Sequence, residues 1–243
     1  MNRRSFITTT GQAGIGFVLG PSVLSKASAS KGSKTSKPNI VLMMIDDWRY
    51  ADASCLGSDL YQTPNIDKLR SEGMFFSNHY CAGAVCTPAR CGAMTGKQAA
   101  RFDMNMVYMP RKGRIQKLIE PPVERNLPVE VPTIANVLKA TGYATAHIGK
   151  WHLGEKGYRP EDHGFEFVSK ELTHKESPIP NDYKNIKYYT GEAIKFIEQN
   201  KDNPFFLYLP HDAMHHDYEA DAKIIKKYKN RIRPGMMHSN STY

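Results

Sequence analysis

Hydrophobic and polar positions along the chain form blocks that predict strands and helices in alternation. Continuous apolar runs at residues 39–45, 143–148 and 204–209 are typical of strands inside a sheet, and we expect the first to be buried on both faces. Helical patterns lie between these runs, at residues 63–73, 88–94, 132–139 and 192–199, and a short strand is expected at 74–77. This alternation predicts an α/β fold, with a mostly parallel central sheet and helices on both faces.

The first 29 residues have the composition of an export signal. Arg3 and Arg4 precede an uncharged, weakly apolar stretch that ends in an Ala-Ser-Ala cleavage site. The Arg-Arg-Ser-Phe-Ile start favours the twin-arginine type, with an ordinary secretory signal as the alternative. We therefore expect export to the bacterial periplasm or extracellular space, with a signal peptide at 1–29, a flexible tether at 30–38 and one domain at 39–243.

Composition and charge exclude several classes of protein. Among 243 residues, 40% are hydrophobic, and no uncharged apolar run reaches the ~18 residues that a membrane-spanning helix needs. Four cysteines are too few for a disulfide-stapled scaffold, and the lack of a C-x-x-C pair excludes a cysteine-rich zinc module. The formal net charge of +9 comes from scattered Lys and Arg, with one denser patch at 223–233. This charge suits an anionic substrate, and we expect no nucleic-acid partner and no stable membrane insertion.

Polar side chains follow each of the three predicted strands. Parallel sheets bind ligands beyond the carboxyl ends of their strands, so these positions are candidates for a site. Asp46 and Asp47 follow the first run, residues 150–152 the second and residues 211–216 the third. Two adjacent carboxylates need a positive partner, which a hard cation such as Ca²⁺ or Mg²⁺ would provide. The alternative is an aspartate pair that caps backbone N–H groups of a loop.

The sharpest local pattern runs from Cys86 to Arg90. Thr87 is expected to cap a helix that has Pro88 in its first turn, which places Cys86 at the positive end of that helix. With Arg90 one turn further on, this is a place to bind an oxyanion. A buried, inert cysteine is the alternative. A thiol phosphatase is excluded because its cysteine and arginine stand further apart.

The spacing C-x-P-x-R-x-x-x-x-T-G, from Cys86 to Gly96, resembles the signature of the sulfatase family, in the alkaline-phosphatase-like superfamily. Other segments are similar to motifs of that family, in the same order along the chain: residues 39–47, 63–67, 142–154 and 204–215. The resemblance covers about residues 38–220. It implies that 39–243 is the N-terminal part of a sulfatase catalytic domain, whose fold is incomplete at its C-terminus.

The resemblance implies a sulfuric ester hydrolase that cleaves sulfate monoesters of carbohydrates or aryl alcohols. A maturation enzyme would convert Cys86 to formylglycine, whose hydrated aldehyde is the nucleophile. The implied catalytic residues are Cys86 as formylglycine, Arg90, Lys150, His152 and His215, and the implied ligands of Ca²⁺ or Mg²⁺ are Asp46, Asp47 and Cys86.

Each implied residue has a role in handling charge or protons. Arg90 and Lys150 would neutralise charge at the nucleophile and the sulfate. His152 would orient the nucleophile or take its proton, and His215 would contact the leaving-group oxygen. His211 and His215 also have the H-x-x-x-H spacing of a zinc site, which we discount because a loop is expected from Pro210.

Two alternatives stay open. No Asp-Asn pair of the kind sulfatases carry, usually within S-D-N-G, and no matching later Lys follow residue 216, so we expect an N-terminal fragment or truncated product. A non-catalytic fragment is therefore one alternative, and a phosphonate or phosphate ester hydrolase of the same superfamily is the other. Substrate specificity is expected to depend on the loop-like insertions at 98–132 and 174–185.

Overall fold

The computed structural model of the chain describes residues 37–108, 121–173 and 176–236. The expected signal at 1–29 and nearly all of the tether at 30–38 lie outside the described residues. Within the described residues, no helix is both long and apolar enough to cross a membrane.

Four parallel strands form one sheet in the described part of the chain. They are β1 (Ile40–Ile45), β2 (Ala144–His147), β3 (Phe167–Val168) and β4 (Phe205–His211), in the spatial order β1-β4-β2-β3. The predicted parallel sheet is confirmed. β3 was not predicted, because its two residues are too few to form an apolar run.

The helices bear out the predicted alternation. The longer ones are α2 (Pro64–Glu72), α3 (Cys86–Thr95), α4 (Ile134–Ala140), α5 (Ile186–Asn200) and α6 (Ala222–Lys229). Short 3-10 helices occur at Tyr50–Asp52, Ser54–Leu56, Ala99–Phe102, Pro160–His163 and Tyr183–Asn185. Proline in the first turn of α2 and the hydrogen bond from the Asn136 N–H to the Thr133 hydroxyl at the start of α4 explain where these two helices begin.

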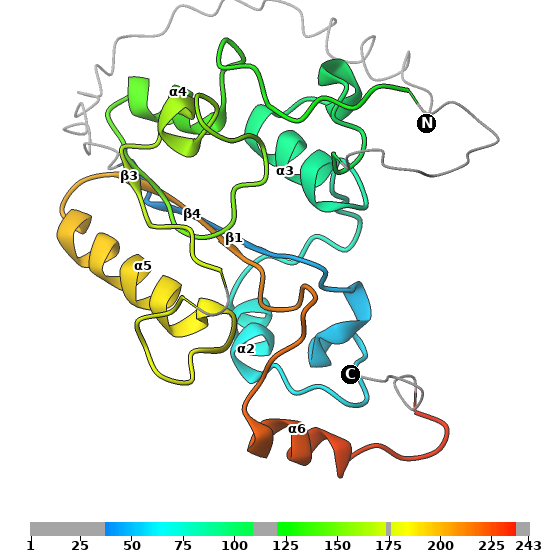
Figure 1. Cartoon of the computed structure of the whole chain (residues 1–243). Coiled ribbons are helices and arrows are strands. Elements are labelled where there is room, and N and C mark those ends of the chain that lie inside the picture. Colours follow the sequence, from blue (N-terminus) through cyan, green and yellow to red (C-terminus); the bar gives the residue numbers. More distant parts are fainter. Residues whose placement is uncertain (1–36, 109–120, 174–175, 237–243) are drawn as a thin grey trace, which may run out of the picture. The chain divides into compact units, whose positions relative to one another are not determined.

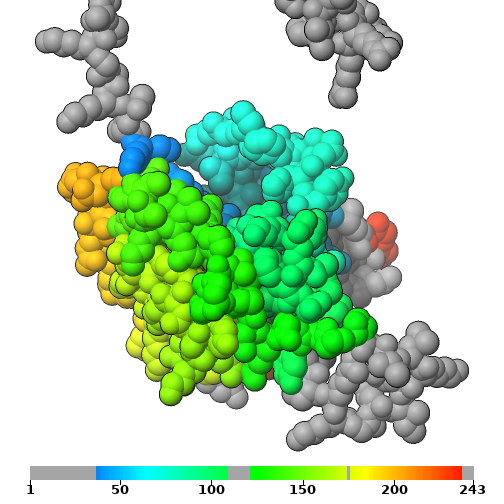
Figure 2. Space-filling model, turned by 90° about the horizontal axis from the view of Figure 1, so that it is seen from above, coloured from blue at the N-terminus to red at the C-terminus, as the bar shows by residue number. Residues whose placement is uncertain are grey.

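Helices cover both faces of the sheet, as the alternating side chains of β4 show. Phe206 and Tyr208 belong to a core that includes Cys91 and Met94 of α3. Phe205 and Leu207 point the other way, into a second core built around α5. Figure 1 shows α3 and α4 above the strands and α5 below them. Figure 2 looks down on the upper layer, where cyan and green segments cover most of the blue start of the domain.

Two strand predictions are wrong. Residues 74–77 form no strand, and Met74 and Phe76 are exposed. β1 is covered on one face only: Leu42 and Met44 pack partly buried against the core, whereas Val41 and Met43 are 48% and 58% exposed. β1 lies at the edge of the described sheet, and α5 packs on β4 and β2 instead. An apolar run therefore predicted the strand correctly but not the number of covered faces.

Candidate active site

Three chain segments meet at the carboxyl end of the sheet. The Asp46 N–H donates to the His211 carbonyl at 2.9 Å, and the Lys150 N–H donates to the Pro210 carbonyl at 3.0 Å. Gly149 makes this approach possible, since its φ is +128° and an added Cβ would lie 2.3 Å from the Pro210 oxygen. The ends of β1 and β4 and the turn after β2 are thereby held against one another. Contrary to expectation, Pro210 belongs to β4 and the loop begins after His211.

The Asp46 carboxylate contacts three other predicted site residues. Its Oδ1 accepts a hydrogen bond from the Cys86 thiol at 3.0 Å, and its Oδ2 lies 3.3 Å from Nη2 of Arg90. The same Oδ2 also pairs with the Lys150 ammonium group. Burial raises the pKa of Asp46, but the Lys150 hydrogen bond and the Arg90 charge outweigh it and hold the pKa at about 2. The carboxylate is therefore ionised at any physiological pH.

Arg90 is fixed from three sides. Its side chain is 1% exposed, and its Nη1 donates to the Lys150 carbonyl at 2.8 Å and to the Tyr208 hydroxyl at 3.3 Å. With the Asp46 contact, the guanidinium has one orientation, directed at the end of β1. Tyr208 was not predicted from the sequence, because a tyrosine inside an apolar strand gives no sign of a polar role.

Cys86 is the first residue of α3, so its thiol lies at the positive end of a helix. Val85 is the N-cap, and Thr87 is not the cap that the sequence suggested. The buried Thr87 hydroxyl instead donates to the His152 carbonyl at 3.4 Å. Burial and the Asp46 hydrogen bond raise the pKa of the Cys86 thiol, even though Lys150 Nζ is 3.8 Å from Sγ. A protonated thiol is a weak nucleophile, so this geometry does not favour chemistry through a cysteine thiolate.

Asp47 and His215 stand at the open side of the cluster. Asp47 has a φ of +57°, a left-handed conformation that turns the chain away from β1, and its side chain is 49% exposed. His215 Nε2 lies 3.9 Å from Asp47 Oδ2. The two residues therefore face each other beyond the Asp46 carboxylate.

His152 lies in the turn after β2, two residues beyond Lys150. It too is left-handed, with a φ of +59°, and such strained residues cluster at functional sites. Its Nδ1 is buried without a hydrogen-bond partner among the described residues. Burial, together with the charges of Lys150 and Arg90, lowers the pKa of His152 to about 4. The imidazole is therefore neutral at pH 7 and available to accept a proton.

The donor atoms fit a hard cation only in part. Ligand atoms of Asp46, Cys86 and His215 all lie within 4.8 Å of one another. A thiol and an imidazole suit zinc better than Ca²⁺, whereas the carboxylates of Asp46 and Asp47 suit Ca²⁺ or Mg²⁺. An oxygen at position 86, in place of sulfur, would make the set match a hard cation. His211 is not in this cluster, since its ring faces Tyr189 of α5 at 6.3 Å, which agrees with discounting the H-x-x-x-H zinc site.

A cavity of about 360 Å³ opens beside the cluster. Thr87, Lys150 and His152 form its inner wall. Its remaining lining residues were not predicted from the sequence: Tyr108, Arg125, Gly154, Glu155 and Glu171. Tyr108 and Arg125 belong to the 98–132 insertion that was expected to determine specificity. Glu155 comes directly after the 142–154 motif, and Glu171 comes shortly after β3, a strand that was itself not predicted, so neither glutamate was singled out from the sequence.

Comparison with known proteins supports the assignment that the motifs suggested. A family model described as sulfatase matches residues 38–238. An arylsulfatase from Hemicentrotus pulcherrimus is 32% identical over 217 residues, which make up 74% of this chain and 37% of the relative. N-acetylgalactosamine-6-sulfatase from Canis lupus familiaris is 29% identical over 225 residues, or 79% of this chain and 42% of the relative.

Solved structures agree with these relatives. The crystal structure of Ps i-CgsB in complex with k-i-k-neocarrahexaose has a TM-score of 0.64 and 28% identity, covering 80% of this chain and 49% of that one. A protein solved with its substrate D-glucosamine-2-N,6-O-disulfate has a TM-score of 0.63 and 27% identity, covering 82% of this chain and 39% of that one. The chain spans less than half the length of each of these four relatives. The chain belongs to the sulfatase family.

Proposed function

We propose that this protein hydrolyses sulfate monoesters and that residue 86 carries the nucleophile. The observation that supports this most directly is the arrangement of two cations around one position. Lys150 Nζ is 3.8 Å from the Cys86 sulfur, and Arg90 is paired with the Asp46 carboxylate that accepts the thiol hydrogen bond. A sulfate held at position 86 would therefore meet fixed positive charge.

Four side chains of the cluster would bind the sulfate or transfer protons. Lys150 would hold the sulfate oxygens, and Arg90 would keep Asp46 ionised and in place. Neutral His152 would take a proton from the nucleophile. His215, on the open side of the cluster, would donate to the oxygen of the departing alcohol.

Two groups complete the proposal. Asp46, Asp47 and an oxygen at position 86 would hold Ca²⁺, or Mg²⁺ in its place, and the bound cation would withdraw charge from the sulfate. A formylglycine-generating enzyme would convert Cys86 to the aldehyde, whose hydrate offers an oxygen nucleophile in place of a protonated thiol. The two groups support each other, since conversion of Cys86 would replace the sulfur atom, the poor match in the donor set, with an oxygen that suits the cation.

We also propose that residues 1–29 direct export, by the twin-arginine route, to the periplasm or beyond the cell. The arginine pair and the Ala-Ser-Ala site support this. The substrate would be a sulfated carbohydrate or an aryl sulfate, because the relatives include an arylsulfatase and a protein solved with a sulfated glucosamine as its substrate.

Sulfate release by the matured protein tests the proposal. The chain is produced together with a formylglycine-generating enzyme and assayed in Ca²⁺ with 4-nitrophenyl sulfate, 4-nitrophenyl phosphate and glucose 6-sulfate. We expect sulfate release that Cys86→Ala lowers at least about a thousandfold. Cys81→Ala, at an exposed cysteine, is the matched control and keeps full activity. Faster phosphate release would favour the phosphatase alternative, and no turnover of any ester would favour a non-catalytic fragment.

A further inference from the structure

The cavity beside Lys150 and His152 has an unusually ionic outer wall. Arg125, Glu155 and Glu171 line it, together with Tyr108 and the backbone of Gly154. No aliphatic side chain beyond the threonine methyl is among its described lining residues. Most small-molecule pockets of this size, about 300–1,000 Å³, are lined largely by apolar groups. The apolar surface of this cavity comes from the Tyr108 ring and the carbon atoms of charged side chains, so any ligand here lies next to charged groups.

Two hydrogen bonds from backbone N–H groups hold this wall in place. The Leu127 N–H donates to the Leu153 carbonyl at 2.8 Å, and the Glu155 N–H donates to the Asn126 side chain at 3.3 Å. Gly154 has a φ of +148°, and an added Cβ would lie 2.5 Å from the Tyr158 Cβ. These hydrogen bonds hold the segment of Arg125 beside the turn of Glu155. Glu155 follows His152 by three residues, so the wall lies close to the catalytic cluster.

The charged groups on the wall are available to a ligand. Arg125 pairs with Glu155, but the two side chains are 49% and 67% exposed, and such surface pairs hold their partners weakly. The Arg125 guanidinium also lies 5.6 Å from the centre of the Tyr108 ring. The Glu171 carboxylate lines the same cavity as Lys150 and His152, near the Trp151 backbone, and burial raises its pKa.

We propose, on the basis of the sulfatase function proposed above, that Arg125, Glu155 and Glu171 select a hydroxylated sugar ring as the alcohol part of the ester. Ionised carboxylates only accept hydrogen bonds and the guanidinium only donates them. Sugar hydroxyls do both, so one ring can satisfy all three side chains. An aryl ring could stack on Tyr108 or Arg125, but it would take water from the two carboxylates without donating a hydrogen bond to either. A site built for hydroxyl groups therefore discriminates strongly against a substrate that lacks them.

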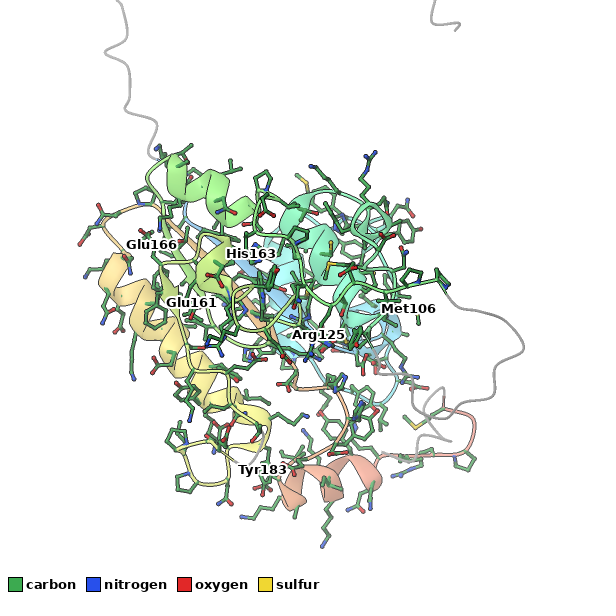
Figure 3. All side chains as sticks on the ribbon, turned by 45° about the horizontal axis from the view of Figure 1, so that its top comes forward. Met106, Arg125, Glu161, His163, Glu166 and Tyr183 are labelled. Carbon is green, nitrogen blue, oxygen red and sulfur yellow. The ribbon has the colours of Figure 1, made fainter. Side chains whose placement is uncertain are left out.

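Leucine variants of the two glutamates test this, because leucine removes the acceptors and adds apolar surface. For Glu155→Leu and Glu171→Leu we expect kcat/KM for glucose 6-sulfate to fall about tenfold or more, with kcat/KM for 4-nitrophenyl sulfate unchanged or raised. Glu161→Leu is the matched control, since Glu161 is exposed and does not line the cavity. Figure 3 labels Glu161 and Arg125 at separate places on the molecule. An equal loss with both esters would overturn the proposal, because it would indicate a structural role.

A binding measurement separates failure of this subsite from failure of the proposed function. Saturation-transfer NMR with glucose 6-sulfate and the unmodified chain needs no turnover. Signals at the sugar ring protons that disappear in Glu171→Leu and persist in Glu161→Leu would support the subsite even if no ester were hydrolysed. Absence of such signals, or their persistence in both variants, would overturn it.

Discussion

At the scale of single residues, one buried carboxylate organises the site. Asp46 is 6% exposed and contacts Cys86, Arg90 and Lys150. A carboxylate buried among fewer partners would be protonated or destabilising, whereas here the cations hold it ionised. The positive groups are thus positioned before any anionic ligand arrives, which removes the cost of reorganising them during a reaction.

The Lys150 ammonium group should matter for activity more than for stability. Lys150→Met keeps the length of the side chain and removes the charge, so we expect sulfate release to fall by about a hundred- to a thousandfold. Lys139→Met is the matched control, because Lys139 forms an exposed pair with Glu166 that contributes at most about 1 kcal/mol. Steady-state kinetics of the two variants, with urea unfolding alongside, give the comparison. Equal activity in both would contradict the role of Lys150.

Sequence alone was a good guide to residues with a local pattern. Asp46, Cys86, Arg90 and Lys150 follow strands or stand in a short motif, and the fold brings all four into contact. Arg125, Glu155 and Glu171 could not be found in this way, because they meet only through the folding of irregular segments. The Thr87 cap was predicted wrongly, since α3 begins two residues earlier than the threonine pattern suggested, with Val85 in place of Thr87 as the N-cap.

At the scale of elements, hydrophobic runs predicted the strands but not their surroundings. β4 was predicted well because all seven of its residues are buried between two helical layers. β1 has the same kind of sequence and yet exposes Val41 and Met43. The number of faces that neighbours cover is a property of the whole sheet, so a single run of residues does not contain it.

The turn after β2 should be intolerant of any side chain at position 149. Gly149→Ala would place a methyl group against the Pro210 carbonyl in a left-handed backbone, so we expect a loss of about 3 kcal/mol in the free energy of unfolding. The same change should displace Lys150 and lower sulfate release.

Gly191→Ala is the matched control for this experiment. Gly191 lies in α5, and an added Cβ would meet nothing within 4 Å. Alanine there should stabilise the protein by about 0.5–1 kcal/mol. Urea unfolding of both variants gives the comparison, and equal stabilities would contradict the packing described at the strand ends.

At the scale of the whole molecule, buried histidines make the core sensitive to acid. His147 is 1% exposed and packs against Trp151, Phe165 and Tyr208. Burial lowers the pKa of His147 to about 3. The unfolded chain binds a proton at His147 near pH 6.5, whereas the folded chain does not, so stability falls as the pH is lowered through 6.5.

A variant without this histidine should lose less stability in acid. Between pH 7 and pH 5, His147→Phe should reduce the loss in the free energy of unfolding by about 2 kcal/mol, at up to about 1.4 kcal/mol per pH unit. Urea unfolding at both pH values measures this difference independently of any change in stability at pH 7. His79→Phe, at an exposed histidine, is the control and should keep the pH dependence of the parent protein. Identical pH dependence in both variants would refute the prediction.

The proposal that residue 86 carries the nucleophile is best tested by determining the chemical state of that residue. Trypsin releases residues 71–90 as one peptide, which contains both Cys81 and Cys86. The protein is produced with a formylglycine-generating enzyme, alkylated and digested. We expect mass spectrometry to show one alkylated cysteine, at position 81, and an aldehyde at position 86. Cys86→Ala shows the pattern without an aldehyde, and a sulfatase of known maturation, produced in the same cells, confirms that the enzyme is active. Alkylation of both Cys81 and Cys86 in protein from those cells would contradict the proposed formylglycine nucleophile.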